Sequence, residues 1–143
     1  MSQPIRLLLV DDHEMVRNGV RAFFEAHPDF EVVGEAASGA EAVEQAARLV
    51  PDVVLMDLIM PGMDGVEATR QVKKVSPRSQ IVVLTSYHED EHIFPALKAG
   101  AISYILKDVK MAELADAARR AAAGEATLHP RVASRVVQEL HGL

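Results

Sequence analysis

The chain has 143 residues, a length typical of one domain, and 49% of them are hydrophobic although only 4% are aromatic. It has no cysteine for disulfide or thiolate chemistry, and its net charge of −6 excludes a global basic field for nucleic acid. No apolar run approaches membrane-spanning length, and we expect no signal peptide because a strand begins almost at once. These features favour a cytoplasmic domain with an aliphatic core.

Short apolar runs alternate with helical patterns along most of the chain. The runs predict strands at Ile5–Val10, Phe30–Ala36, Val53–Asp57, Gln80–Thr85 and Ala101–Leu106. Apolar residues at helical spacing predict helices near residues 15–24, 38–49, 65–73, 90–99 and 111–122. Such alternation with short connections predicts an α/β fold, a doubly wound parallel sheet of five strands with helices on both faces.

The helix near residues 90–99 has the weakest of these patterns. Pro95 falls near the end of its first turn, and proline is tolerated in a helix only where the amide has no partner within the helix. We therefore expect this helix to be short and irregular at its start.

The C-terminal segment forms a separate pattern. A break over Gly124–Pro130 precedes apolar residues that recur every four positions at Val132, Val136 and Leu140, which predicts a further helix. We expect a domain over residues 1–123, with a linker and helix over residues 124–143. Two interpretations stay open: the helix docks on the domain, or it begins a linker whose apolar stripe contacts a partner.

Polar residues follow four of the predicted strands: Asp11, Asp12, Asp57, Thr85 and Lys107. Because the carboxyl ends of parallel strands meet at one edge of a sheet, these residues should converge. Three carboxylates repel one another unless a cation lies between them, and Mg²⁺ prefers oxygen ligands. A lysine and a hydroxyl group suit a phosphoryl group. The pattern predicts that Asp57 attacks phosphorus to form an aspartyl phosphate.

Four segments contain these residues: Leu9–His13, Asp57–Gly65, Thr85–Ser86 and Lys107–Asp108. Together they resemble the receiver domain of two-component response regulators over residues 5 to about 123. The resemblance implies a flavodoxin-like fold that takes a phosphoryl group from a sensor histidine kinase, with Mg²⁺ as cofactor. It also implies a switch that dimerises on phosphorylation, rather than a turnover enzyme.

The resemblance assigns roles to individual positions. Asp57 matches the phosphoacceptor, and Thr85 and Lys107 match the groups that hold the phosphoryl group. The remaining matches are Asp11 and Asp12 as the acidic pair at the metal, the backbone carbonyl of Ile59 as a further metal ligand, and Tyr104 as the aromatic residue whose orientation is coupled to Thr85.

One local feature narrows the resemblance to a branch of the family. Many receivers have proline after the lysine, whereas Asp108 stands here and fits the NarL/FixJ type better. Regulators of that type carry a LuxR-type helix-turn-helix domain after the receiver. We therefore expect this chain to contact DNA only through a C-terminal domain that it does not contain, and to contact no membrane.

The lifetime of a phosphoryl group on Asp57 depends on access by water. In the family, the residues two positions beyond the phosphoacceptor and two beyond the switch hydroxyl border the path of hydrolysis. Here they are Ile59 and Tyr87, and neither side chain is suited to orient water. The sequence thus predicts a phosphorylated form that decays slowly.

Three other functions are weighed against this one. A haloacid-dehalogenase-type phosphatase needs a second acid two residues after the nucleophile, where this chain has Ile59. A flavin-binding module of similar topology needs a phosphate loop, and the acidic Asp11-Asp12 turn would repel phosphate. A stand-alone receiver without an output domain stays possible.

The six histidines are scattered and show no metal-ligand spacing.

Overall fold

The computed structural model describes residues 3–86 and 90–143. Five parallel strands form one sheet in the order β2-β1-β3-β4-β5. The strands are β1 (Ile5–Val10), β2 (Phe30–Ala36), β3 (Val53–Asp57), β4 (Gln80–Thr85) and β5 (Ala101–Leu106). Their bounds are those predicted from the apolar runs, and the predicted α/β class and doubly wound topology are confirmed.

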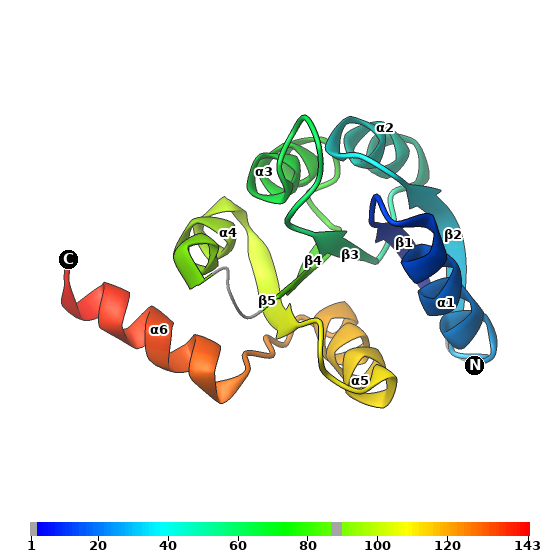
Figure 1. The fold of residues 1–143 in the computed structure, drawn as a ribbon. Coiled ribbons are helices and arrows are strands. Elements are labelled where there is room, and N and C mark those ends of the chain that lie inside the picture. The colour runs from blue at the N-terminus through cyan, green and yellow to red at the C-terminus, as the bar shows by residue number, and fades with distance from the viewer. Residues whose placement is uncertain (1–2, 87–89) are drawn as a thin grey trace.

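Helices cover both faces of the sheet (Figure 1). They are α1 (Glu14–Glu25), α2 (Gly39–Leu49), α3 (Gly65–Val75), α4 (Ile93–Ala99), α5 (Met111–Ala122) and α6 (Pro130–His141). One core cluster joins α1 and α5 to one face of the sheet, and a second joins α2, α3, α4 and α6 to the other. No helix in the described part of the chain has the length and apolar character that a bilayer crossing requires.

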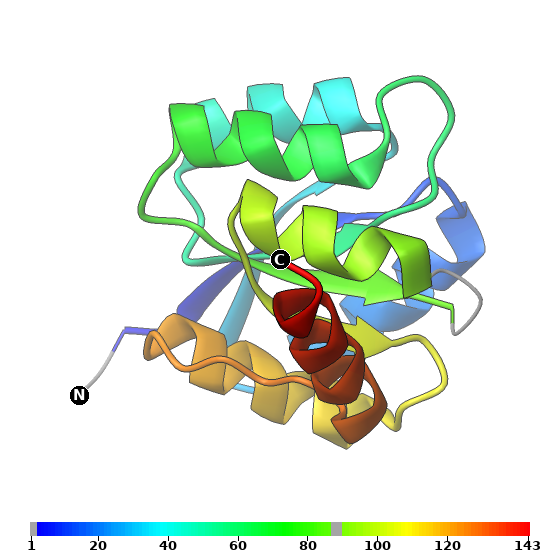
Figure 2. The same cartoon turned by 90° about the vertical axis from the view of Figure 1, so that its left-hand side faces the viewer.

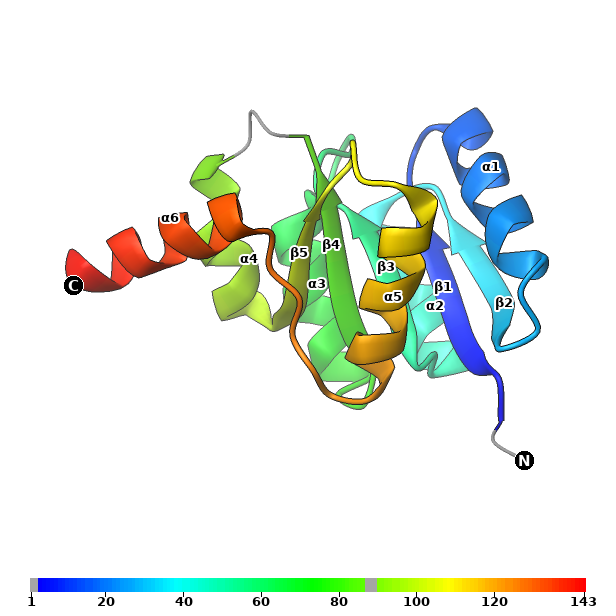
Figure 3. The same cartoon turned by 90° about the horizontal axis from the view of Figure 1, so that it is seen from below.

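The strand order reverses between β1 and β3, which are neighbours in the sheet. Figure 3 shows the strand arrows pointing toward one edge of the sheet. In open parallel sheets, a crevice for a ligand forms outside the carboxyl ends of the strands at such a reversal. The residues that follow β1 and β3 therefore lie where this architecture places its binding sites.

The loop between β3 and α3 is held tightly against the end of β3. The amide of Gly65 donates to the carbonyl of Leu58 at 2.9 Å. A Cβ atom at Gly65 would lie 2.5 Å from Leu58 Cα and 2.6 Å from the Asp57 carbonyl oxygen, so only glycine fits without a shift of the backbone. The Asp64 side chain caps α3 by accepting from the Glu67 amide. Glycine and cap together fix the course of the chain next to Asp57.

The start of the fourth helix is irregular, as its proline predicted. A short 3₁₀ segment at Asp90–His92 precedes α4, and Pro95 lies in the first turn of the α-helical part. Gly100 ends the helix with a φ of +123°, a conformation that favours glycine. The helix is therefore short, and its path is set by these two residues.

The first turn of the C-terminal helix packs against the domain. Helix α6 lies beside α4 (Figures 1 and 2), and Val132 is buried there. The preceding linker runs along the free edge of β5, where the Tyr104 amide donates to the carbonyl of Thr127 at 3.2 Å. The start of the stripe is therefore used within the chain, whereas Leu140 at its end is 53% exposed, and both interpretations of the helix are compatible with this packing.

Candidate acidic site at the carboxyl ends of the strands

Asp57 is the most deeply buried acid of the site, because it is the last residue of the central strand β3 and is 1% exposed. Its Oδ1 atom accepts a hydrogen bond from the Ile59 amide at 3.2 Å and lies 3.1 Å from Lys107 Nζ. Its Oδ2 atom is buried and has no hydrogen-bond partner. A buried carboxylate oxygen without a donor is costly, so this atom is suited to meet an electrophile or a cation.

The surroundings of Asp57 act on its ionisation in opposite directions. Burial raises the pKa of the Asp57 carboxyl above its ordinary value, and the negative charge of Asp11 adds to this effect. The ammonium of Lys107 lowers the pKa of the same carboxyl without cancelling the effect of burial. The charged form of Asp57 is therefore less favourable here than in water, and a second cation would favour it.

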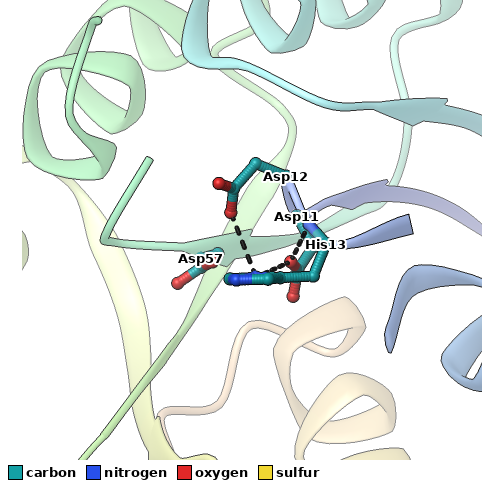
Figure 4. A group of neighbouring side chains, drawn as sticks. All are labelled: Asp11, Asp12, His13 and Asp57. Atoms are coloured by element: carbon teal, nitrogen blue, oxygen red, sulfur yellow. Dashed lines mark hydrogen bonds and ion pairs between the residues drawn. The ribbon is translucent and has the colours of Figure 1, made fainter. Parts of the chain in front are cut away.

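The turn after β1 brings two further carboxylates to Asp57. One side-chain ligand atom each from Asp11, Asp12, His13 and Asp57 lies within 4.8 Å of the others (Figure 4). Asp11 is held in place by a hydrogen bond from the His13 amide to its Oδ1 at 2.8 Å. The Oδ1 atom of Asp12 is buried without a hydrogen-bond partner. Asp57 Oδ2 thus has no donor, whereas the nearest possible donor to Asp12 Oδ1 is the imidazole of His13.

His13 is a member of this group that the sequence analysis missed. Its Nδ1 lies 3.1 Å from Asp11 Oδ1 and 3.2 Å from Asp12 Oδ1, while its side chain is 63% exposed. The spacing of the histidines gave no indication that His13 would lie beside these carboxylates. The available signal was its position directly after the acidic pair, because a residue there turns back over the end of β1.

Thr85 and Lys107 come to the same edge from the neighbouring strands. Thr85 ends β4 and is 1% exposed, and the Lys107 amide donates to the Thr85 carbonyl at 2.7 Å, which joins the two strand ends. Tyr104 lies within β5, is 1% exposed and belongs to the core cluster that includes α4 and α6. The residues predicted to converge do so, with Tyr104 buried behind them.

The two positions predicted to border the path of hydrolysis differ in what the structure describes. The amide of Ile59 donates to Asp57, and Ile59 is 50% exposed. Tyr87 lies outside the described residues. The position two residues after Asp57 therefore supplies a backbone donor and an apolar side chain, and no second acid for general acid–base catalysis.

The possible metal ligands at this edge of the sheet fit a hard divalent cation. Carboxylate oxygens from Asp11, Asp12 and Asp57 approach one another, and Asp57 Oδ2 is buried without a hydrogen-bond partner. Mg²⁺ takes oxygen ligands, often one or two carboxylates together with waters and phosphate oxygens. A cation here would relieve both the repulsion and the missing hydrogen bonds, so these residues are suited to hold it.

The fold and this acidic edge define a class of protein, and the sequence comparisons agree with it. Residues 7–119 match the sequence profile of the response regulator receiver domain. This match covers most of the chain, and the chain belongs to that family.

Individual relatives narrow the similarity. The chain is 54% identical over 136 residues to the transcriptional regulatory protein LiaR of Bacillus subtilis, covering 95% of this chain and 64% of that protein. It is 50% identical over 128 residues to the response regulator protein VraR of Staphylococcus aureus, covering 90% of this chain and 61% of that protein. This chain therefore spans somewhat less than two thirds of these curated relatives.

A solved structure shows the same arrangement of elements. The crystal structure of a LuxR-family two-component response regulator from Aurantimonas aligns with a TM-score of 0.86 and 36% identity. The alignment covers 96% of this chain and 98% of that one. The similarity to LuxR-family regulators agrees with the branch that the sequence motifs indicated.

Proposed function

We propose that this chain is a phosphorylation switch in which Asp57 accepts a phosphoryl group from a sensor histidine kinase. An oxygen of the Asp57 carboxylate forms a bond to phosphorus while the bond from phosphorus to the donor histidine nitrogen breaks, and that nitrogen keeps the electron pair. The observation that carries the proposal is the state of the carboxylate: Lys107 Nζ lies 3.1 Å from Oδ1, and Oδ2 is buried without a donor.

The neighbouring residues have separate tasks in the proposed reaction. Asp11, Asp12, Asp57 and the backbone carbonyl of Ile59 would hold Mg²⁺, which neutralises negative charge on the transferring group when bound. Lys107 holds a phosphoryl oxygen as a compact positive charge. The rest of the site keeps the Asp57 oxygen oriented and largely shielded from bulk water.

We propose that Thr85, Lys107 and Tyr104 transmit the change. Thr85 donates its hydroxyl to the new phosphoryl group, and Tyr104, which is a buried residue of β5, responds to the space that Thr85 leaves. The direct bond between the Lys107 amide and the Thr85 carbonyl supports coupling between the two strand ends. The output is a change in the surface formed by α4, β5 and the linker.

The partners follow from this proposal. We propose that residues 1–123 form the receiver and that residues 124–143 lead to a DNA-binding domain outside this chain, as the names of the transcriptional relatives suggest. The sensor kinase docks near the first helix, and the phosphorylated receiver forms a homodimer in the cytoplasm. In this structure α6 packs against α4, and the linker is hydrogen-bonded to the edge of β5.

Two alternative functions can be compared with this proposal. A phosphatase that turns over through an aspartyl phosphate would need a second acid near Asp57, and the half-exposed Ile59 occupies that position. A stand-alone receiver would use the same chemistry, so it differs only in output. We therefore propose a switch whose phosphorylated form decays slowly, rather than a turnover enzyme.

The test is intact-mass spectrometry after incubation with acetyl phosphate, with and without Mg²⁺. Wild type should gain the mass of one phosphoryl group only when Mg²⁺ is present, and Asp57→Asn should gain none. Asp64→Asn is a matched control, because asparagine also caps a helix and Asp64 caps α3 in the loop after Asp57. A mass gain in Asp57→Asn, or its absence in the control, would contradict the assignment.

A further inference from the structure

Arg17 joins three elements next to the acidic pair. It lies on α1, its Nη1 donates to the backbone carbonyl of Asp11 at 2.5 Å, and its Nε donates to Glu35 Oε1 on β2 at 2.8 Å. The Arg17 side chain is only 15% exposed and that of Glu35 is 22% exposed. A partly buried guanidinium that bridges two acceptors at fixed angles is more specific than a surface ion pair.

The backbone of Asp11 is therefore held on both sides. Its amide donates to the Ala36 carbonyl at 3.1 Å, as a continuation of the pairing between β1 and β2, and its carbonyl accepts from Arg17. That carbonyl belongs to the planar peptide unit between Asp11 and Asp12. Fixing this unit limits the rotations on either side of it, and so limits where the carboxylates of both residues point.

We propose that Arg17 is a positioning residue for the metal-binding carboxylates: it holds the peptide unit between Asp11 and Asp12 so that both face Asp57. The inference rests on the proposed function, since it assumes that these carboxylates hold Mg²⁺. Arg17 itself contacts neither the cation nor the phosphoryl group. It acts in the way that hydrogen-bond partners around metal ligands act elsewhere, by fixing the ligands before the metal arrives.

The positive charge of Arg17 should act on Mg²⁺ binding in the opposite direction to its positioning of the carboxylates. The two effects can therefore be separated. A guanidinium near the site repels a divalent cation, so its removal would strengthen Mg²⁺ binding if charge alone mattered. Glu35 accepts from Arg17 and from Arg21, and its negative charge offsets much of this repulsion. The positioning effect should therefore dominate, and removal of Arg17 should weaken binding.

The chain offers a matched control on the same helix. Arg21 lies one turn after Arg17 and also pairs with Glu35; its other ion-pair partner among the described residues is Glu25, rather than the backbone of Asp11. Arg21→Gln removes the same charge from the same carboxylate. It should leave the peptide unit of Asp11 in place.

The experiment is calorimetric titration of the full 143-residue chain with Mg²⁺, for wild type, Arg17→Gln, Arg17→Lys and Arg21→Gln. Arg17→Gln should raise the Kd about 10-fold, the scale found for partners of metal ligands, and Arg21→Gln less than about twofold. Arg17→Lys keeps the charge but loses the planar pair of donors, so it should weaken binding as well.

The Mg²⁺ dependence of phosphorylation by acetyl phosphate is a second, independent measurement. In Arg17→Gln, the Mg²⁺ concentration for half-maximal rate should rise with the Kd, while the rate at saturating Mg²⁺ stays near that of wild type. Circular dichroism checks that each variant is folded. If Arg17→Gln does not fold, Arg17→Lys is the variant that tests the inference. An unchanged or lower Kd in Arg17→Lys, or an equal rise in Arg21→Gln, would overturn the inference.

The result is distinguishable from a failure of the proposed function. If wild type takes up a phosphoryl group with Mg²⁺ and the Arg17 variants bind Mg²⁺ with the same Kd as wild type, the inference is wrong and the proposed function stands. If wild type takes up no phosphoryl group, the proposed function is wrong whatever the variants show.

Discussion

The Asp57 carboxyl is held in its reactive position at the expense of stability. Burial raises its pKa, the Lys107 ammonium compensates only in part, and one of its oxygens has no donor. When the pKa of an acid is higher in the folded chain than in the unfolded one, the fold loses stability as the pH rises through that pKa. Below the ordinary pKa of an aspartate, the acid is neutral in both states and this loss disappears.

Asp57→Asn should therefore stabilise the chain in the absence of Mg²⁺. We expect the free energy of unfolding at pH 7 to rise by about 1 kcal/mol, the scale of an ordinary point substitution, because a neutral amide replaces a buried carboxylate. The gain should shrink as the pH is lowered below about 4, where the wild-type acid is also neutral. Urea unfolding in EDTA at both pH values measures it. A variant that is less stable at pH 7 would mean that the pair with Lys107 outweighs burial.

The linker and α6 are attached to the edge of the sheet by a small number of contacts with β5 and the neighbouring core. Thr127 accepts from the Tyr104 amide and donates its own amide to Ser103 Oγ at 2.9 Å, so a few hydrogen bonds attach it to β5. The apolar part of the attachment is Leu128 and Val132, packed in the same core cluster as Tyr104. Because Tyr104 lies beneath this segment, docking of α6 and burial of Tyr104 should depend on each other.

Val132→Asp should release α6 while the sheet stays folded. Val132 is 2% exposed, and placing a charge there replaces a favourable apolar burial of roughly 2 kcal/mol with a desolvation cost. Limited proteolysis should then cut within residues 124–141, and the Tyr104 amide should exchange faster with deuterium. Val137→Asp is the matched control, since Val137 on the same helix is 48% exposed. Equal sensitivity of the two variants would show that the docked position of α6 is not maintained by Val132.

Over the whole molecule, the sequence predicts the elements better than the details that join them. Apolar runs that end in polar residues predict the strand bounds, and parallel topology alone brings Asp11, Asp57 and Lys107 to one edge. The position of the His13 ring and the attachment of Arg17 to Asp11 depend on side-chain geometry between elements, which periodicity does not contain. The docking of α6 was undecided because an apolar stripe is the same whether its partner lies inside or outside the chain.

The clustered carboxylates also connect the site to the stability of the complete domain. The acidic group combines the turn between β1 and α1 with the end of β3, so a cation bound there joins segments that are far apart in sequence. The overall charge of −6 opposes compaction in a general way that any salt would relieve. Specific binding of Mg²⁺ and general screening therefore act in the same direction and must be separated by measurement.

Mg²⁺ should raise the Tm of the chain more than a monovalent salt does. A ligand that binds only the folded state at ten times its Kd adds about 1.4 kcal/mol, which is roughly 5 °C for a domain of this size. Differential scanning fluorimetry with MgCl₂, against NaCl at equal ionic strength, measures the specific part. Asp12→Asn should keep the effect of NaCl and lose most of the effect of Mg²⁺, because a buried carboxylate oxygen of the cluster becomes part of a neutral amide. If NaCl raised the Tm as much as MgCl₂ did, the stabilisation would come from screening of the net charge, and the carboxylates would not form a magnesium site.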